Sequence, residues 1–192
     1  MIYKDKVFAE EEIKGRDFEK EVFTGCRFLG ISFRFTSFKN CEFKLCDFSG
    51  SFFDITSFSG CSFAESKLSN LDFSGAGFKD CDFSGAVMLN CTFQKLKDGN
   101  QNIRERLSLR DCRFEKTDLQ NSVFVLCDLA KVNFSGANLQ GAVFEKCDLS
   151  ETDFSGCNLN GTGFDTSRIQ KTILDVEGFI SFGNSKGFVL DK

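Results

Sequence analysis

The chain has 192 residues, of which 28 are acidic and 24 are basic, so its net charge is −4. It contains no histidine, which excludes a Ser-His triad and an imidazole general base, and we expect neither an enzyme nor a cofactor. No apolar run approaches the ~18 residues of a membrane span, and the first residues, MIYKDKVF, lack the apolar core of a signal peptide. We therefore expect a cytoplasmic protein with no membrane partner.

A period of five residues begins at Phe8. Five residues advance a helix by about 500° and put successive strand residues on opposite faces, so the period fits neither element. A chain that turns a corner in one direction about every five residues keeps all these side chains inside. The period therefore predicts a coil that winds around an axis. Up to residue 93, the central positions (position i) are Phe8, Ile13, Phe18, Phe23, Phe28, Phe33, Phe38, Phe43, Phe48, Phe53, Phe58, Phe63, Leu68, Phe73, Phe78, Phe83, Met88 and Phe93.

Two flanking positions support the coil. Position i−2 should also face inward, because residues two apart in an extended segment point the same way. It is mostly Cys, Ser, Thr or Ala, whereas the first four such residues are charged: Lys6, Glu11, Arg16 and Glu21. Position i+2 holds 11 of the 17 glycines, Gly75 among them, and glycine tolerates the positive φ of a type II corner.

The frame breaks at residues 94–108. The period requires Phe93 and Leu109 to be separated by a multiple of five residues. Their actual separation is larger than a multiple of five by one, six or eleven positions. The polar stretch KLKDGNQN favours the two larger sizes and an excursion loop. This loop is either a tolerated insertion or a partner contact, since loops on a rigid scaffold often carry contacts. The candidate contact residues are Lys97, Asp98, Gly99, Asn100, Gln101, Asn102, Arg104 and Arg106.

The period resumes over residues 109–174, which brings the total to 32 large apolar positions that hold 21 of the 26 phenylalanines. From Thr117 to Asp165, seven acids and two bases give a net charge of −5, which disfavours direct binding of nucleic acid. These acids form either a solvated face or an acidic rod offered to a basic, DNA-binding groove. In the second interpretation the acidic face comprises Asp118, Asp128, Glu145, Asp148, Glu151 and Asp153.

Residues 175–192 leave the period. The stretch VEGFISFGNSKG suits a short helix that ends near Gly183 or Gly187. The end of a solenoid exposes apolar core and unpaired backbone, so it must be capped. Phe179, Phe182 and Phe188 are the cap residues; they form a cap alone or also join two copies end to end as a homodimer.

The motifs CDFSG, ANLQG, CDLSE and CNLNG resemble the pentapeptide-repeat family, whose consensus is A-(D/N)-(L/F)-x-x. The resemblance covers about residues 8–174. It implies an all-β fold, a right-handed quadrilateral β-helix with four pentapeptides in each coil. Thirty-two positions then make eight coils, a rod on the order of 40 Å long at about 4.8 Å per coil. We expect one solenoid domain over residues 1–192, with coils at 8–93 and 109–174 and a cap at 175–192.

All ten cysteines fall at position i−2. A zinc site needs converging pairs such as C-x₂-C and often recruits histidine, and the chain has neither. In a quadrilateral coil, stacked pairs such as Cys41 with Cys61 would have Cβ atoms about 4.8 Å apart, whereas a disulfide prefers about 3.8 Å. We therefore predict ten small, buried, reduced core residues and no metal.

Within this family the chain is similar to the Qnr-type proteins, which protect DNA gyrase from quinolones. The similarity lies in YKDKVF, the continuous coils, the excursion loop and the LDVEGF ending. It implies a dimeric DNA mimic that binds DNA gyrase, with topoisomerase IV as a second candidate, and a loop that disturbs the drug-bound cleavage complex. Qnr proteins of the main group carry two loops, whereas here the frame is unbroken up to Phe93. The alternative is a structural or interaction scaffold for another protein, because fold does not fix function.

Overall fold

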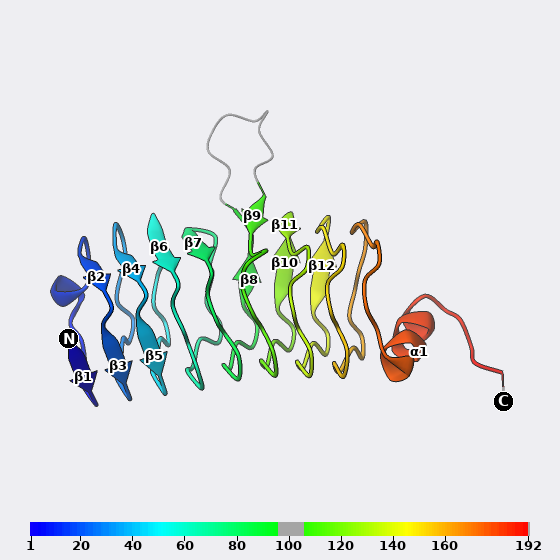
Figure 1. Cartoon of the computed structure of the whole chain (residues 1–192), viewed down its shortest axis with the longest axis horizontal. Coiled ribbons are helices and arrows are strands. Elements are labelled where there is room, and N and C mark those ends of the chain that lie inside the picture. The colour runs from blue at the N-terminus through cyan, green and yellow to red at the C-terminus, as the bar shows by residue number, and fades with distance from the viewer. Residues whose placement is uncertain (96–105, 192) are drawn as a thin grey trace.

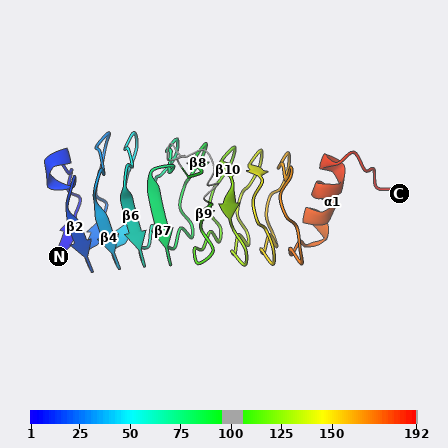
Figure 2. The same ribbon diagram turned by 90° about the horizontal axis from the view of Figure 1, so that it is seen from above.

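The computed structural model describes residues 1–95 and 106–191. The chain winds as a right-handed, four-sided β-helix whose coils follow one another from the N-terminus to a helix at the C-terminal end (Figure 1). Turned by 90°, the coils form one straight row and the helix lies across the last of them (Figure 2). The quadrilateral β-helix predicted from the sequence is confirmed.

Each coil consists of four sides of one pentapeptide each and bonds to the next coil through parallel backbone pairing. Phe18 pairs with Phe38 and Phe38 with Phe58, so central residues lie directly over one another. We number the four sides by their first central residue: side 1 at Phe8, side 2 at Ile13, side 3 at Phe18 and side 4 at Phe23. Sides 1 to 3 each carry eight central residues, which makes eight layers separated by seven full turns.

The strands are only two to four residues long because a corner follows every five residues. All strand pairs are parallel, and a short 3-10 helix, η1 (Glu10–Glu12), lies in the first coil. Side 4 contains β1 (Ile2–Lys4), β3 (Val22–Thr24) and β5 (Glu42–Lys44); side 3 contains β2 (Asp17–Glu19), β4 (Ser37–Lys39), β6 (Thr56–Ser59), β7 (Ala76–Lys79), β9 (Leu107–Ser108) and β11 (Cys127–Asp128); side 2 contains β8 (Thr92–Phe93), β10 (Val123–Val125) and β12 (Val143–Glu145).

The core is a set of aromatic stacks along the axis. The ring centroids of Phe63 and Phe83 are 4.9 Å apart with an interplanar angle of 8°, and those of Phe83 and Phe114 are 5.0 Å apart. Within one coil, neighbouring rings meet edge to face, as Phe78 and Phe83 do at 5.3 Å. Such pairs contribute about 0.5–1.5 kcal/mol each beyond the burial of their area.

The two ends of the stack differ from the sequence-based prediction. Tyr3 stacks on Phe23 at 5.0 Å, so the aromatic period begins one pentapeptide before Phe8. At the other end Ile169 is half exposed, because no further coil covers it. The expectation that every central residue lies inside is therefore wrong for Ile169.

The side chains at position i−2 bond to the backbone of the preceding coil. Thr56 Oγ1 donates to the carbonyl oxygen of Phe33 at 2.8 Å, and Cys91 Sγ makes the equivalent contact with Leu68 O at 3.0 Å. In each case the acceptor is the carbonyl group of the central residue that precedes the equivalent corner in the previous coil. A small side chain with a donor satisfies this carbonyl group without filling the axis, which explains why Cys, Ser and Thr alternate there.

Nine of the ten cysteines are buried, as predicted, but Cys157 is partly exposed near the end of the solenoid. Burial raises the pKa of Cys46, Cys91 and Cys157 to about 12, because an apolar environment disfavours the thiolate.

The corner residues at i+2 adopt left-handed backbone, with φ of +64° at Gly60 and +70° at Gly85. Non-glycine corner residues do the same, as Asn40 shows with φ of +52°. Gly75 is an exception and does not have positive φ. A Cβ there would meet the carbonyl oxygen of Phe53 at 2.2 Å, so Gly75 allows a close approach of two backbones rather than a left-handed turn.

Helix α1 (Val176–Ser185) closes the C-terminal end. One oxygen of the Asp175 carboxylate accepts a hydrogen bond from Gly178 N at 2.7 Å, and the other accepts from Gly156 N at 2.8 Å, so this side chain joins the helix to the last coil. The helix ends before Gly187, whose φ is +85°, in agreement with the sequence. Within residues 1–95 and 106–191, no helix has the length and apolarity to span a bilayer.

We predict that Phe83→Asp unfolds the coils around it. Phe83 is fully buried between two rings, so the substitution would bury an unpaired charge and remove two stacking contacts. We expect a loss of several kcal/mol in the free energy of unfolding, on the order of 3–5 kcal/mol, whereas Phe83→Leu should cost less than about 2 kcal/mol. Urea denaturation followed by far-UV circular dichroism measures both, and equal stabilities would contradict the inward stack.

We predict that a thiol reagent labels Cys157 first and the other nine cysteines slowly. The thiolate is the reactive form, and a pKa of about 12 keeps Cys91 and Cys157 alike protonated at neutral pH, so access decides the order: Cys157 is partly exposed and the other nine thiols are buried. Above the ordinary thiol pKa of about 8.5, unfolded chains lose these protons while the folded protein keeps them, so the free energy of unfolding should fall as pH rises from about 8.5 towards 12. Rapid labelling of several thiols at neutral pH would contradict the burial.

Candidate protein-interaction site

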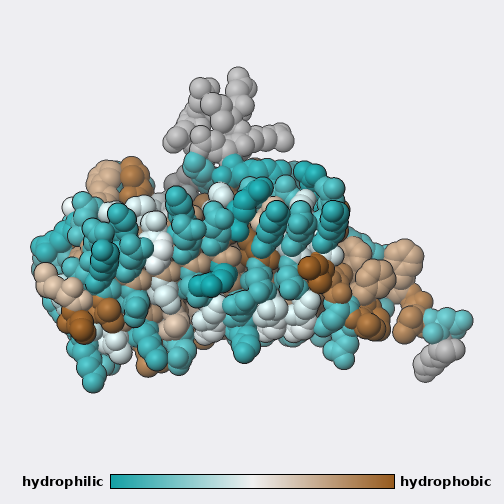
Figure 3. All heavy atoms as spheres, viewed as in Figure 1, coloured by the Kyte–Doolittle hydropathy of each residue, from teal (hydrophilic) through white to brown (hydrophobic). Residues whose placement is uncertain are grey.

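One edge of the four-sided rod differs from the other three. We call the corner between sides 2 and 3 the loop edge. Residues 96–105 follow Lys95 and precede Arg106, and the registers of β8 and β9 place both flanking residues on this edge. The surface is mainly hydrophilic between the two ends, with apolar atoms on the upper edge near the N-terminal end and around α1 (Figure 3). The i+2 residues of the loop edge are Gly15, Phe35, Ile55, Gly75, Lys95, Leu126, Lys146 and Thr166.

The register on either side of residues 96–105 fixes the size of the insertion. In a regular coil, Cys46 N donates to Ser66 Oγ, 20 residues later in the chain. Across the frame break, Cys91 N makes the same bond to Ser122 Oγ, 31 residues later. The insertion is therefore the largest of the three sizes that the frame allows, eleven positions. Since Phe93 pairs with Phe124 and β9 with β11, Lys95 and Arg106 both lie one coil before Leu126, so the chain leaves the loop edge and returns to it at the same point.

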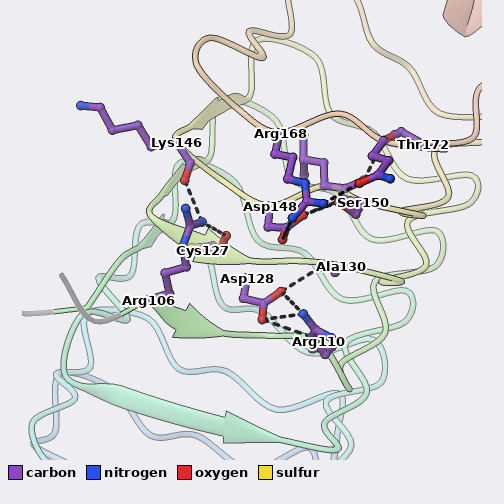
Figure 4. Close-up of polar contacts among 12 residues, drawn as sticks. Arg106, Arg110, Cys127, Asp128, Ala130, Lys146, Asp148, Ser150, Arg168 and Thr172 are labelled. Atoms are coloured by element: carbon purple, nitrogen blue, oxygen red, sulfur yellow. Dashed lines mark hydrogen bonds and ion pairs between the residues drawn. The ribbon is translucent and has the colours of Figure 1, made fainter.

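Of the eight predicted contact residues, only Arg106 lies within the part of the chain that the structure describes. Lys97 to Asn102 and Arg104 lie outside the described residues. Arg106 Nη1 donates to Lys146 O at 2.9 Å and to Cys127 O at 3.3 Å, which belong to the next two coils (Figure 4). Hydrogen bonds from a charged donor are worth about 1.5–3 kcal/mol. Arg106 thus anchors the C-terminal base of the insertion to the coils beyond it.

Basic and acidic side chains pair along side 3 next to this anchor. Arg110 makes a two-point contact with the Asp128 carboxylate, at 3.1 Å and 3.2 Å, and Arg168 lies 3.7 Å from Asp148 (Figure 4). The hydroxyl group of Ser150 donates to Asp148 at 2.6 Å, and this bond is the main reason that the pKa of Asp148 is lowered. The carboxylates on this side are partly neutralised at short range by these arginine side chains.

The six residues of the expected acidic face do not lie on one face. Asp118 is on side 1, Glu145 on side 2, Asp128 and Asp148 on side 3 with Glu151 at the corner that follows, and Asp153 on side 4. Each side takes five residues, so acids spaced by five or ten residues point in directions a quarter or a half turn apart. The acidic charge is therefore distributed around the rod.

Most of these acids also have a structural role that the sequence did not reveal. The carboxylate of Asp153 accepts from the backbone N–H of Ser155 at 2.8 Å, and that of Asp148 accepts from Ser150 N at 3.0 Å. Asn133 makes the same bond to Ser135 N at 2.8 Å. Asp or Asn at position i−1 therefore holds the corner that follows, in the manner of an Asx turn.

The C-terminal end presents an apolar surface. Phe182 packs on Phe164 with centroids 5.7 Å apart and so acts as a cap. Phe179 and Phe188, by contrast, are 69% and 73% exposed, and with Leu190 they line a groove of about 380 Å³ beside α1. A cap requires only the contact of Phe182 with Phe164, and the exposed rings of Phe179 and Phe188 add nothing to it.

Two family models match the chain. The model described as pentapeptide repeats (8 copies) matches residues 22–54 and 56–94, and the model described as a pentapeptide repeat region matches residues 105–174. Together they cover 142 of the 192 residues. A search of curated proteins found no match.

Several solved structures resemble the chain. Full-length QnrB1, a plasmid-mediated fluoroquinolone resistance protein, is 20% identical over 95% of this chain and 96% of its own, with a TM-score of 0.48. HetL, a pentapeptide repeat protein involved in heterocyst differentiation regulation in the cyanobacterium Nostoc, is 14% identical over 91% of this chain and 87% of its own, with a TM-score of 0.34. Rfr23 from the cyanobacterium Cyanothece is 24% identical over 59% of this chain and 64% of its own, with a TM-score of 0.34.

We predict that Arg106→Gln loosens the coil beyond the insertion. The shorter, neutral side chain would leave Lys146 O without its charged donor, so amides in β9 and β11 should exchange hydrogen faster, and stability should fall by about 1–2 kcal/mol. Arg110→Gln is the matched control, because its ion pair with Asp128 is half exposed and such pairs are worth less than about 1 kcal/mol. Equal effects of the two changes on hydrogen exchange would contradict the anchor.

Proposed function

Because the chain belongs to the pentapeptide-repeat family, we propose that it acts by binding another protein, and that this partner is a type II topoisomerase: DNA gyrase, with topoisomerase IV as a second candidate. In this proposal the protein occupies the DNA-binding groove of the enzyme in the cytoplasm and protects it from quinolones. The similarity of both chain ends to Qnr-type sequences supports the choice of partner.

The observation that carries the proposal is the insertion at one corner of an otherwise regular rod. A solenoid tolerates extra residues only where they leave the hydrogen-bond ladder, and a rigid scaffold holds such a segment at a fixed place. Arg106 fixes the base of the insertion at this place. The proposed role of residues 97–102 is to reach the drug-bound cleavage complex while the coils supply affinity.

The charge distribution supports a DNA-like shape more than a DNA-like charge. Acids on all four sides resemble a duplex, which carries phosphates around its whole circumference. A duplex of about 35 Å, the length of seven coil steps, carries about 20 phosphate charges. The net charge of this chain is only −4, and Asp128 and Asp148 have arginine partners. Electrostatic attraction alone is therefore too weak, and the proposal requires shape and apolar contacts in addition.

The second half of the proposal is a homodimer through the C-terminal segment. The exposed rings of Phe179 and Phe188 and the groove beside them suit a twofold contact, in which the same patch of each copy covers the other. Two rods joined end to end would double the length available to a groove of the topoisomerase.

One observation favours the alternative, an interaction scaffold for a different protein. Exposed and half-exposed carboxylates are paired in Arg34–Asp54, Lys6–Glu12 and Lys186–Asp165, at 2.9, 2.8 and 3.0 Å. A surface with this degree of pairing fits a protein partner that is not specialised for DNA.

We predict that the protein protects purified DNA gyrase from a fluoroquinolone in a supercoiling assay at micromolar concentration. Deletion of residues 97–102 should abolish protection but leave gyrase binding nearly intact, because the coils form a separate rigid unit. Replacing the same six residues by a Gly-Ser segment of equal length is the matched control for loop length.

A combined Asp148→Asn, Glu151→Gln and Asp153→Asn variant should bind gyrase more weakly, above all at low salt where screening is least. Asparagine keeps the corner bonds, as Asn133 shows, so the variant should fold. If the unmodified protein neither binds nor protects gyrase, the topoisomerase is the wrong partner and the scaffold alternative replaces it.

We predict a mass near twice 21.5 kDa in sedimentation equilibrium. A combined Phe179→Ser and Phe188→Ser variant should sediment as a monomer, because it removes the exposed rings and leaves the packed Phe182 in place. Val7→Ser, an exposed apolar residue at the opposite end, is the control and should remain dimeric. A dimer that survives the double substitution would show that the C-terminal rings do not join the copies.

A further inference from the structure

A ridge of apolar side chains projects from the loop edge in the N-terminal half of the rod. Phe35, Phe52 and Ile55 are 54%, 66% and 65% exposed. Phe35 and Ile55 are corner residues of successive coils on the loop edge, and Phe52 lies on side 2 of the same coil as Ile55, three residues before it. Apolar atoms stand out at this end of the upper edge in Figure 3. We call these three residues the apolar ridge.

The backbone conformation at the ridge is unfavourable for the residues that it carries. Phe35 has φ of +59° and Ile55 has φ of +50°, in the left-handed region that side chains with a Cβ rarely adopt. A β-branched residue such as isoleucine is a strong outlier there. Glycine or asparagine would relieve the strain and remove the exposed apolar surface, so folding alone does not favour the residues present.

The edge that follows side 1 carries corner residues that suit left-handed backbone, whereas the edges that follow sides 3 and 4 also carry residues such as Lys20, Glu65 and Lys131 there. On the edge that follows side 1, the corner residues after the first coil are all Gly or Asn: Gly30, Gly50, Asn70, Asn90, Asn121, Gly141 and Gly161. Of the four large apolar residues with left-handed backbone in the described chain, three lie on the loop edge: Phe35, Ile55 and Leu126. The fourth, Leu45, lies on the edge that follows side 4. Strained apolar corners are thus concentrated on the edge that carries the insertion.

We propose that the apolar ridge is a second contact surface for the protein partner, which in the proposed function is a type II topoisomerase. The inference rests on that function. A strained backbone conformation that folding does not require is evidence for a role of the strained residue in binding. Exposed aromatic and large aliphatic side chains are the residues that supply most of the energy in protein interfaces.

Three properties of the ridge favour this occupant. The exposed apolar area is on the order of 350 Å², at about 200 Å² for each side chain, well below the roughly 800 Å² per partner of a stable interface. The ridge is therefore too small to hold a second copy by itself and must be part of a larger footprint. Its nearest residue, Ile55, lies two coil steps, about 10 Å, from the point where the insertion leaves the rod, so a partner that contacts one reaches the other.

An ion pair also lies beside the ridge. Arg34 pairs with Asp54 at 2.9 Å, and its guanidinium group lies over the ring of Phe35 at 4.7 Å. This pair adds no net charge to the rim, and a paired polar group beside an apolar centre is the ordinary anatomy of a protein interface. Gly75, with no side chain, separates the ridge from the base of the insertion.

The test compares gyrase binding by the unmodified protein and by a combined Phe35→Asn and Ile55→Asn variant, measured by surface plasmon resonance with purified gyrase. Asparagine adopts left-handed backbone more readily than phenylalanine or isoleucine, so the variant should melt at the same temperature or higher. We expect its dissociation constant to rise at least about tenfold. Leu45→Asn, which removes an equally exposed and equally strained apolar residue on another edge, should change the constant less than about twofold.

Each outcome decides between the two proposals. If the unmodified protein binds gyrase and the ridge variant binds equally well, the ridge is refuted while the proposed function stands. The same holds if Leu45→Asn weakens binding as much as the ridge variant does. If the ridge variant changes the sedimentation mass, the ridge joins copies of this chain and the inference is wrong. If the unmodified protein does not bind gyrase at all, the proposed function fails and the ridge loses its occupant with it.

Discussion

The parallel ladder of backbone hydrogen bonds between coils depends on the stack of phenylalanine rings along the axis. Rings of consecutive coils, such as Phe43 and Phe63, lie 5.1 Å apart, close to the 4.7–4.9 Å between hydrogen-bonded strands. Aromatic packing and backbone pairing thus favour the same spacing. A coil of four pentapeptides is the unit that satisfies both, and any departure from it has to be placed outside the ladder.

This constraint explains where the molecule can carry a function. Inward positions are committed to the stack and to the hydroxyl and thiol bonds that satisfy the corner carbonyl groups, as Thr56 does for Phe33. Many aspartates and asparagines before corners are committed to the N–H groups that follow them. What remains is the corner residue, the inserted segment and the two ends of the rod. The insertion, the apolar ridge and the exposed rings of Phe179 and Phe188 occupy these places.

The acidic residues show that a cluster of charge in a repeat sequence does not have to form a charged face on the folded protein. In the sequence, Asp148, Glu151 and Asp153 form a cluster, and clusters of like charge suggest a binding face. On the four-sided rod the same residues turn through a quarter of its circumference, and Asp148 and Asp153 hold corners. The proposed binding to gyrase therefore depends less on charge than the sequence suggested, and more on shape and on the apolar ridge.

The sequence by itself determined the coil, most of its inward residues and left-handed corners, the position of the frame break and the C-terminal helix, because a period of five over 32 apolar positions allows few other arrangements. Three features were decided only by the tertiary structure. The size of the insertion follows from the pairing of Phe93 with Phe124, since a count along the chain fixes the frame only to a multiple of five. Gly75 and Arg106 owe their roles to backbone one or two coils away, which no local pattern reveals. Phe35 and Ile55 are a full coil apart in sequence, and only the stacking of successive coils makes them one surface.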